Sequence, residues 1–128
     1  MRDIASADLP ELAYDDFTDE VHGNTAYVIR TGAEFSKYMH SSYAVVSPYD
    51  GYVIIIARGT VTNGVVRTDA KLQEKDGKYT LVVDVYGDDT MVVGCWNVAM
   101  RVDGFPANKN VTLRLHTHNT RSLDGLYN

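Results

Sequence analysis

The chain has 128 residues, 45% of them hydrophobic and 23% charged, which suits one domain with an ordinary core. Its net charge at pH 7 is −5 and it has no cluster of lysine and arginine, which argues against a nucleic-acid partner. The apolar runs are too short to span a membrane, and a single cysteine, Cys95, excludes an intrachain disulfide.

The acidity of the chain belongs to its N-terminal segment. Residues 1–22 contain seven acidic residues against Arg2, a charge of −6 that leaves about +1 for the rest of the chain. Because this segment is only weakly periodic, we predict a flexible or loosely docked acidic arm over residues 1–23, with room for a short helix near residues 9–17. A single β-rich domain is expected over residues 24–119, followed by a C-terminal tail at 120–128.

A strand and a capped helix are expected to open the domain. Residues 25–30 (TAYVIR) have the composition of a strand. Thr31 and Glu34 then form a capping pattern in which each side chain bonds the backbone N–H of the other residue. An apolar stripe at helical spacing follows: Phe35, Tyr38 and Met39. The sequence therefore predicts a helix over about residues 32–40.

The rest of the chain has the pattern of an antiparallel meander. Five strands are expected, at residues 52–62, 65–74, 79–86, 91–102 and 111–118. Asn63-Gly64 and Asp76-Gly77 are the strongest hairpin signals, because these residue types tolerate the positive φ of a type I′ turn. We therefore predict tight hairpins at both places.

The two predicted turns fix a register, since side chains alternate with a period of two. Thr62 should face Val65, and Leu72 should face Leu81. One apolar face results: Ile55, Ala57, Val61, Val66, Ala70, Leu72, Leu81, Val83, Val85, Val92, Gly94, Trp96 and Val98. The opposite face is mixed, and its apolar members (Ile54, Ile56 and Val82) need cover from the helix or from a second layer. The predicted fold class is α+β and mostly β: an antiparallel meander, either a curled sheet or sandwich-like, with one short helix.

The order of these elements resembles a known family. A strand with Tyr27-Val28-Ile29 leads into the capped helix TGAEFSKYM, and the segments VVRTDAKLQEKDGKYTLVVDVY and VTLRL follow later. Over about residues 25–116 this pattern is similar to the PrcB C-terminal-like domain of bacterial secreted or lipid-anchored proteins, named for an accessory subunit of a surface protease complex. The resemblance implies an envelope or secreted accessory protein, compatible with a lipid anchor upstream of this segment. It supplies no catalytic residues.

Two histidines near the end of the last strand are the candidate metal ligands. His116 and His118 should point to the same side of the strand, on its polar face with Thr112 and Arg114. An i, i+2 pair can bind a metal, but a site needs a third ligand, and Arg114 opposes a bound cation. We favour a solvated strand end and keep metal binding as the alternative.

A second polar group lies on the outer sheet face. The predicted register sets Asp69 beside Asp84, with Arg58 opposite Asp69. Facing like charges are unfavourable unless something offsets them, so one interpretation is a carboxylate pair suited to acid–base chemistry. The other is a surface Arg–Asp pair of little energetic value. Cys95 is expected to be a buried or half-buried structural thiol, and Trp96 a core residue.

Aromatic residues in two loops are the candidate binding residues. Tyr43, Tyr49 and Tyr52 lie in or beside the loop at 41–51, and Phe105 lies in the loop at 103–110. Tyrosine suits recognition because its ring is rigid and has both an apolar body and a polar tip.

These features favour a non-catalytic binding or accessory protein with a protein partner, no cofactor, and a secreted or envelope location. One alternative is a small hydrolase or metal-binding protein that uses the outer sheet face. Another is a cytosolic β-rich module, because Met1 alone does not decide whether a signal peptide has been removed.

Overall fold

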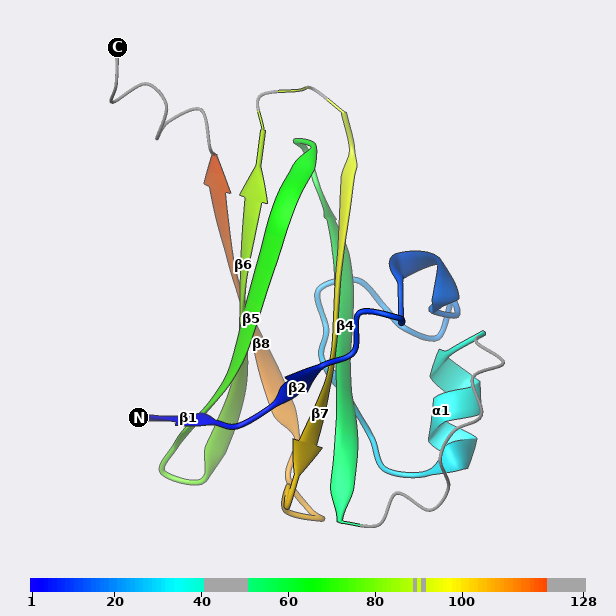
Figure 1. Ribbon diagram of the computed structural model, residues 1–128, viewed down its shortest axis with the longest axis vertical. Coiled ribbons are helices and arrows are strands. Elements are labelled where there is room, and N and C mark those ends of the chain that lie inside the picture. Colours follow the sequence, from blue (N-terminus) through cyan, green and yellow to red (C-terminus); the bar gives the residue numbers. More distant parts are fainter. Residues whose placement is uncertain (41–50, 89, 91, 120–128) are drawn as a thin grey trace.

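The computed structural model describes residues 1–40, 51–88, 90 and 92–119. The elements in chain order are β1 (Arg2–Ile4), β2 (Ala7–Asp8), the 3₁₀ helix η1 (Tyr14–Asp16), β3 (Tyr27–Ile29), α1 (Gly32–Tyr38), β4 (Tyr52–Val61), β5 (Val65–Lys75), β6 (Lys78–Gly87), β7 (Gly94–Asp103) and β8 (Val111–Asn119). The strands form two four-stranded sheets, in the orders β1-β5-β6-β8 and β2-β7-β4-β3 (Figure 1). The fold is α+β and mostly β, as the sequence predicts.

The two sheets share one apolar interior. Its buried members come from both sheets: Val28, Val53, Ile55, Ala57, Leu72, Leu81, Val83, Val85, Trp96, Val98, Met100, Val102 and Val111. Trp96 is the largest of the fully buried side chains and lies beside Gly59, its register partner on β4. The predicted apolar face is thus largely correct, but it is divided between two facing sheets.

The predicted hairpin at Asn63-Gly64 is wrong. β4 pairs with β3 and β7, and the chain passes from β4 into the other sheet to form β5. Neither Asn63 nor Gly64 adopts the positive φ of a type I′ turn. The hairpin at Asp76-Gly77 is confirmed: these residues have φ of 54° and 79°, and Leu72 faces Leu81 as expected.

Contacts with the β6–β7 connection hold the crossing segment. The N–H of Asp88 donates to the carbonyl of Gly64 at 2.8 Å, and the N–H of Gly64 donates to Thr90 Oγ1 at 3.2 Å. A Cβ on Gly94 would collide with the carbonyl oxygen of Asn63, so the crossing requires a glycine at the start of β7. Tertiary packing therefore outweighs the local turn preference of Asn-Gly here.

Two more predictions about the strands fail. Val66 and Val92, assigned to the inner face, are 61% and 56% exposed. For Val66 the cause is a β-bulge between Val65 and Arg67, which shifts the alternation of side chains. The last strand also departs from an antiparallel meander, because β8 runs parallel to β6.

The helix begins where the capping pattern predicts. Thr31 Oγ1 accepts a hydrogen bond from the N–H of Glu34 at 3.1 Å. Glu34 Oε1 accepts from the N–H of Arg30 at 3.0 Å, one residue earlier than a capping box requires. The helix ends at Tyr38, slightly before the predicted end.

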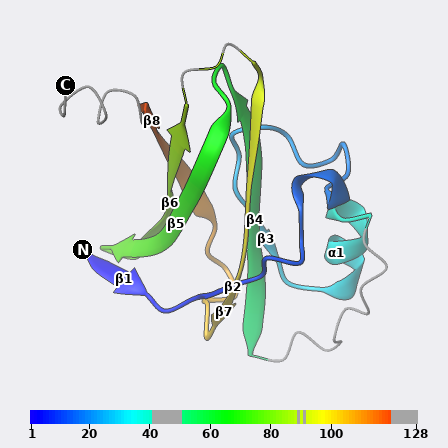
Figure 2. The ribbon, with the colours of Figure 1, turned by 45° about the horizontal axis from the view of Figure 1, so that its top comes forward.

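A second apolar cluster covers the outer face of the β4–β7 sheet. Its buried members come from α1, the N-terminal segment and the sheet: Leu12, Phe17, Val21, Ile29, Phe35, Met39, Ile54, Ile56 and Ala99. Figure 2 shows α1 and η1 on this side, away from β5, β6 and β8. The segment expected to be an acidic arm is therefore packed on the sheet, because its sparse apolar residues point inward while its acidic residues stay in solvent.

Arg58 ties the N-terminal segment to β4. Its guanidinium donates to three backbone carbonyls, those of Phe17 (3.2 Å), Thr18 (2.8 Å) and Val21 (3.2 Å). It also lies over the rings of Tyr14 and Phe17, at 5.1 and 5.7 Å from the ring centroids. One cation thus holds a stretch of irregular backbone against the sheet.

The contact between Gly59 and Trp96 gives a test of the core. A Cβ at residue 59 would lie 2.8 Å from two carbons of the Trp96 ring, which is fully packed. We expect Gly59→Ala to lower the free energy of unfolding by about 1–3 kcal/mol through overpacking, measured by urea denaturation. Gly32→Ala is the matched control, since a Cβ there meets nothing within 4 Å. Equal stability of the two variants would contradict this packing.

Candidate functional site

Polar side chains of β5, β6 and β8 form two rows on the outer face of the first sheet. In one row, Asp69 faces Asp84, which faces His116. In the other, Arg67 faces Tyr86, which faces His118. The prediction that Asp69 and Asp84 are direct cross-strand neighbours is confirmed.

Each of the two facing carboxylates has its own cationic or hydrogen-bonding partner. Arg67 Nε lies 3.1 Å from Asp69 Oδ2, and His118 Nε2 lies 2.9 Å from Asp84 Oδ1. These contacts offset the repulsion between the aspartates. Because the side chains are partly exposed, each pair adds little to stability.

The ring of Tyr86 joins the ends of this group. The Arg67 guanidinium lies 4.1 Å from the ring centroid, and the His118 ring stacks on Tyr86 with centroids 4.6 Å apart and planes at 16°. Stacking of this kind orders long exposed side chains on a flat surface. The cluster therefore orients the exposed side chains at the end of β8.

The expected contact between Arg58 and Asp69 is wrong. Arg58 is paired in register with Asn97 on β7, in the other sheet, and its guanidinium is committed to the carbonyls of the N-terminal segment. The group of Arg58, Asp69 and Asp84 proposed for acid–base chemistry is thus not brought together. Its failure follows from the failed hairpin at Asn63-Gly64, which had set the register.

β8 has one apolar side and one polar side, as predicted. Val111 is buried, and Leu113 and Leu115 are half-buried against the shared interior. His116 and His118 are exposed on the other side, with Arg114. Within the described ranges, no three His, Cys, Asp or Glu side chains gather closely enough to hold a metal ion. The two histidines thus belong to the solvated face of the strand.

β8 also lies at the edge of its sheet. In the described part of the chain it pairs only with β6, in unbroken parallel register from Val111 to Asn119. The edge strands elsewhere are short: β1 and β3 have three residues each and β2 has two. β8 has nine. It therefore presents a long row of backbone N–H and C=O groups on its open side.

The other predicted site residues do not meet at one place. Tyr43 and Tyr49 lie outside the described residues. Tyr52 begins β4, in the other sheet from β8, with the Arg101 guanidinium 4.0 Å from its ring centroid. Phe105 is half-buried and packs edge-on against Tyr79, with the ring centroids 4.8 Å apart.

Cys95 is exposed, so the prediction of a buried or half-buried thiol is wrong. The cause is the alternation of side chains along β7. Trp96 is buried as predicted, at 1% exposure, and its neighbour must then point outward. The apolar surroundings of Cys95 in the sequence suggested burial, although the predicted register already indicated exposure.

Two of the open hollows on the described surface lie beside β5. One, of about 420 Å³, lies between the Thr68–Ala70 part of β5 and the Asn97–Ala99 part of β7, next to residues 8–13. The other, of about 290 Å³, lies near the Asp76-Gly77 turn and is lined in part by Glu74 and Arg114.

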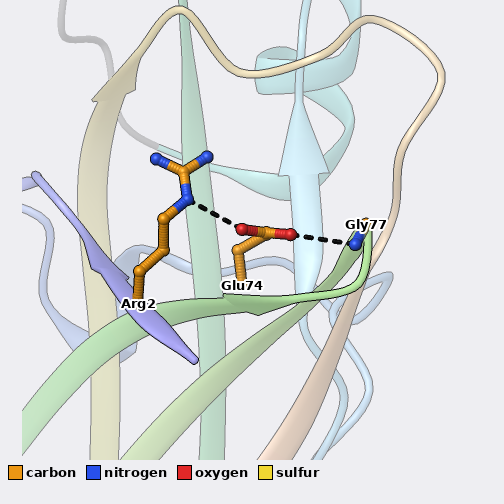
Figure 3. Close-up of polar contacts among 3 residues, drawn as sticks. All are labelled: Arg2, Glu74 and Gly77. Carbon is orange, nitrogen blue, oxygen red and sulfur yellow. Dashed lines mark hydrogen bonds and ion pairs between the residues drawn. The ribbon is translucent and has the colours of Figure 1, made fainter.

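Glu74, beside the second hollow, is committed to structural bonds. Its Oε1 accepts from Arg2 Nε at 2.7 Å and its Oε2 accepts from the N–H of Gly77 at 2.9 Å (Figure 3). The pKa of the Glu74 carboxyl is lowered mainly by the hydrogen bond from Arg2 and to a smaller extent by the hydrogen bond from Gly77. This carboxylate therefore anchors β1 to β5 and is held in its ionised form.

Comparisons with known proteins give no relative: no family model matches the chain, and neither a curated protein nor a solved structure is significantly similar to it. Across the described residues, no helix is both long enough and apolar enough to cross a membrane.

Sequence reasoning missed two features of the site: the role of Arg67 and the position of β8 at the edge of its sheet. The predicted register already places Arg67 on the outer face with Asp69, but alternation alone does not show that Arg67 pairs with Asp69 and lies over the ring of Tyr86. The pairing of β8 with β6 has no local signal, because the two strands are far apart in sequence and no tight turn joins them.

The anchor at Glu74 gives a prediction about pH. We expect Arg2→Met to raise the pKa of Glu74 toward its ordinary value, measured by NMR titration of the side-chain carboxyl. A carboxyl whose pKa is lower in the folded state stabilises the fold above its unfolded pKa. That contribution is lost as the pH falls through the folded pKa, so the destabilisation by Arg2→Met should fade in acid.

Arg101→Met is the matched control, because it removes a different exposed pair, with Asp103 at 3.0 Å. It should leave the titration of Glu74 unchanged. An unchanged pKa of Glu74 in Arg2→Met would show that Arg2 does not hold this carboxylate.

Proposed function

We propose that this protein is a non-catalytic binding domain that recognises a protein partner by strand addition at the open edge of β8. The observation that carries this proposal is the nine-residue edge strand, which has no break in register and no partner on its open side among the described residues. An edge of this kind is a template for an added strand, and main-chain hydrogen bonds supply much of the affinity.

The pairing of the other sheet edges supports β8 as the site of strand addition. The N-terminal segment already pairs with the edge of β5 through β1, and with the edge of β7 through β2. The remaining edge of β5 is interrupted by the bulge at Val66, a feature that discourages strand addition. β8 contains no proline and no bulge, so within the described ranges it is the longest regular stretch of sheet edge without a strand partner.

A secreted or envelope-associated accessory role is part of the same proposal. Its support is the resemblance of residues 25–116 to the PrcB C-terminal-like domain, a domain of secreted or lipid-anchored proteins. A role that depends on binding also agrees with a site built from an edge and a flat charged face.

Two neighbouring proline variants test the proposed edge. Successive N–H groups of a strand point to opposite sides, so of His116→Pro and Thr117→Pro one removes a bond to β6 and the other removes a donor from the open edge. The variant that loses the bond to β6 should be measurably less stable. The variant that loses only the open donor, called the edge variant, should keep the unfolding midpoint of the wild type. Thermal unfolding therefore identifies the edge variant.

Binding is then measured by photo-crosslinking in the producing organism, with a photoreactive residue at Thr112 on the exposed face of β8. We expect an adduct of defined mass that is lost in the edge variant. Glu20 is the control position, because it is exposed in the N-terminal segment that packs on the other sheet. An adduct at Thr112 that persists in both proline variants, or adducts that are the same at both positions, would exclude the β8 edge as the binding site.

A further inference from the structure

We infer that the added strand alternates apolar and acidic side chains, with an acidic residue opposite Arg114. This inference rests on the proposed function, since it assigns the chemistry of the strand that β8 accepts. It follows from the two faces of β8 and from the charges of its neighbours.

The inner side of β8 favours apolar side chains on the added strand. Leu113 and Leu115 pack against the shared interior but remain half-buried, unlike Leu81 and Val83 of the neighbouring β6, which are 0% exposed. A strand laid along the open edge would place alternate side chains beside these leucines. Apolar residues at those positions would bury Leu113 and Leu115 from their open side, just as the strands on both sides of β6 bury the residues of β6.

The outer side of β8 favours acidic side chains on the added strand. Thr112, Arg114, His116 and His118 are exposed there, and β8 has no acidic residue. Arg114 forms no ion pair or hydrogen bond within the described part of the chain, whereas the nearby Asp84 is already bonded to His118. Although the chain has a net charge of −5, this edge therefore carries a cation that no described residue pairs with.

Charge also argues against a second copy of the chain as the occupant. Full antiparallel overlap of two β8 strands would set Arg114 of each copy opposite His116 of the other. This pairing offers Arg114 no anion, and it becomes repulsive whenever the histidine is protonated. A partner with glutamate or aspartate at that position satisfies Arg114 and leaves the leucine contacts intact.

Fluorescently labelled peptides of the length of β8 test the inference. The first alternates valine with glutamate and threonine, the second replaces each glutamate with lysine, and the third has the composition of the first in a non-alternating order. Binding to the full chain is measured by fluorescence anisotropy, for the wild type and for Arg114→Glu. Arg114 is exposed, so this variant should fold normally.

We expect the wild type to bind the glutamate peptide about tenfold more tightly than the lysine peptide, with the preference reversed in Arg114→Glu. The non-alternating peptide should bind weakly to both proteins, because charge alone does not form a strand. Higher salt should reduce the preference between the two alternating peptides.

The contrary outcomes separate the two proposals. Equal or tighter binding of the lysine peptide to the wild type would overturn the acidic partner, while strand addition at β8 would stand. Binding of the alternating peptides no tighter than that of the non-alternating one would overturn both proposals. A dimer in sedimentation velocity that dissociates in the edge variant would make a second copy the occupant and overturn the acidic partner.

Discussion

The architecture depends on the packing of Trp96 in the interior that the two sheets share. The indole lies against Gly59, where no side chain could be accommodated, and its neighbours come from both sheets. This contact needs β4 and β7 to be paired in one sheet while β5 and β6 face them from the other. The chain must therefore change sheets after β4, and Gly94 leaves the space for it to do so.

That arrangement decides where the surface is covered and where it is open. The outer face of the β4–β7 sheet is covered by α1 and the N-terminal segment, which Arg58 holds through three carbonyls. The same segment continues to the edges of β5 and β7 through β1 and β2. The opposite flank ends in β8 (Figure 1), where the regular pattern of the sheet stops with unpaired backbone groups among the described residues.

Local patterns in the sequence predict the elements better than their pairing. The strands from β3 onward, the Thr31 cap and the Asp76-Gly77 hairpin were predictable because neighbouring residues determine them. The short strands β1 and β2 were not, since they lie in the segment expected to be an arm. A period of two tells which face a residue occupies but not which strand lies beside it. The crossing at Asn63-Gly64 and the parallel pairing of β8 depend on tertiary packing. For the site, this means that the position of His116 and His118 on a polar face was predictable, whereas the position of β8 at the sheet edge was not.

The central claim is that the open side of β8 is unpaired in the free protein and becomes paired when a partner binds. Amide hydrogen exchange followed by NMR tests it directly. In the free protein we predict an alternating pattern along Val111–Asn119, with slow exchange for the amides bonded to β6 and fast exchange for those between them. A partner strand should slow the fast set alone. Uniform protection along β8 in the free protein would contradict the account, because the edge would already be occupied.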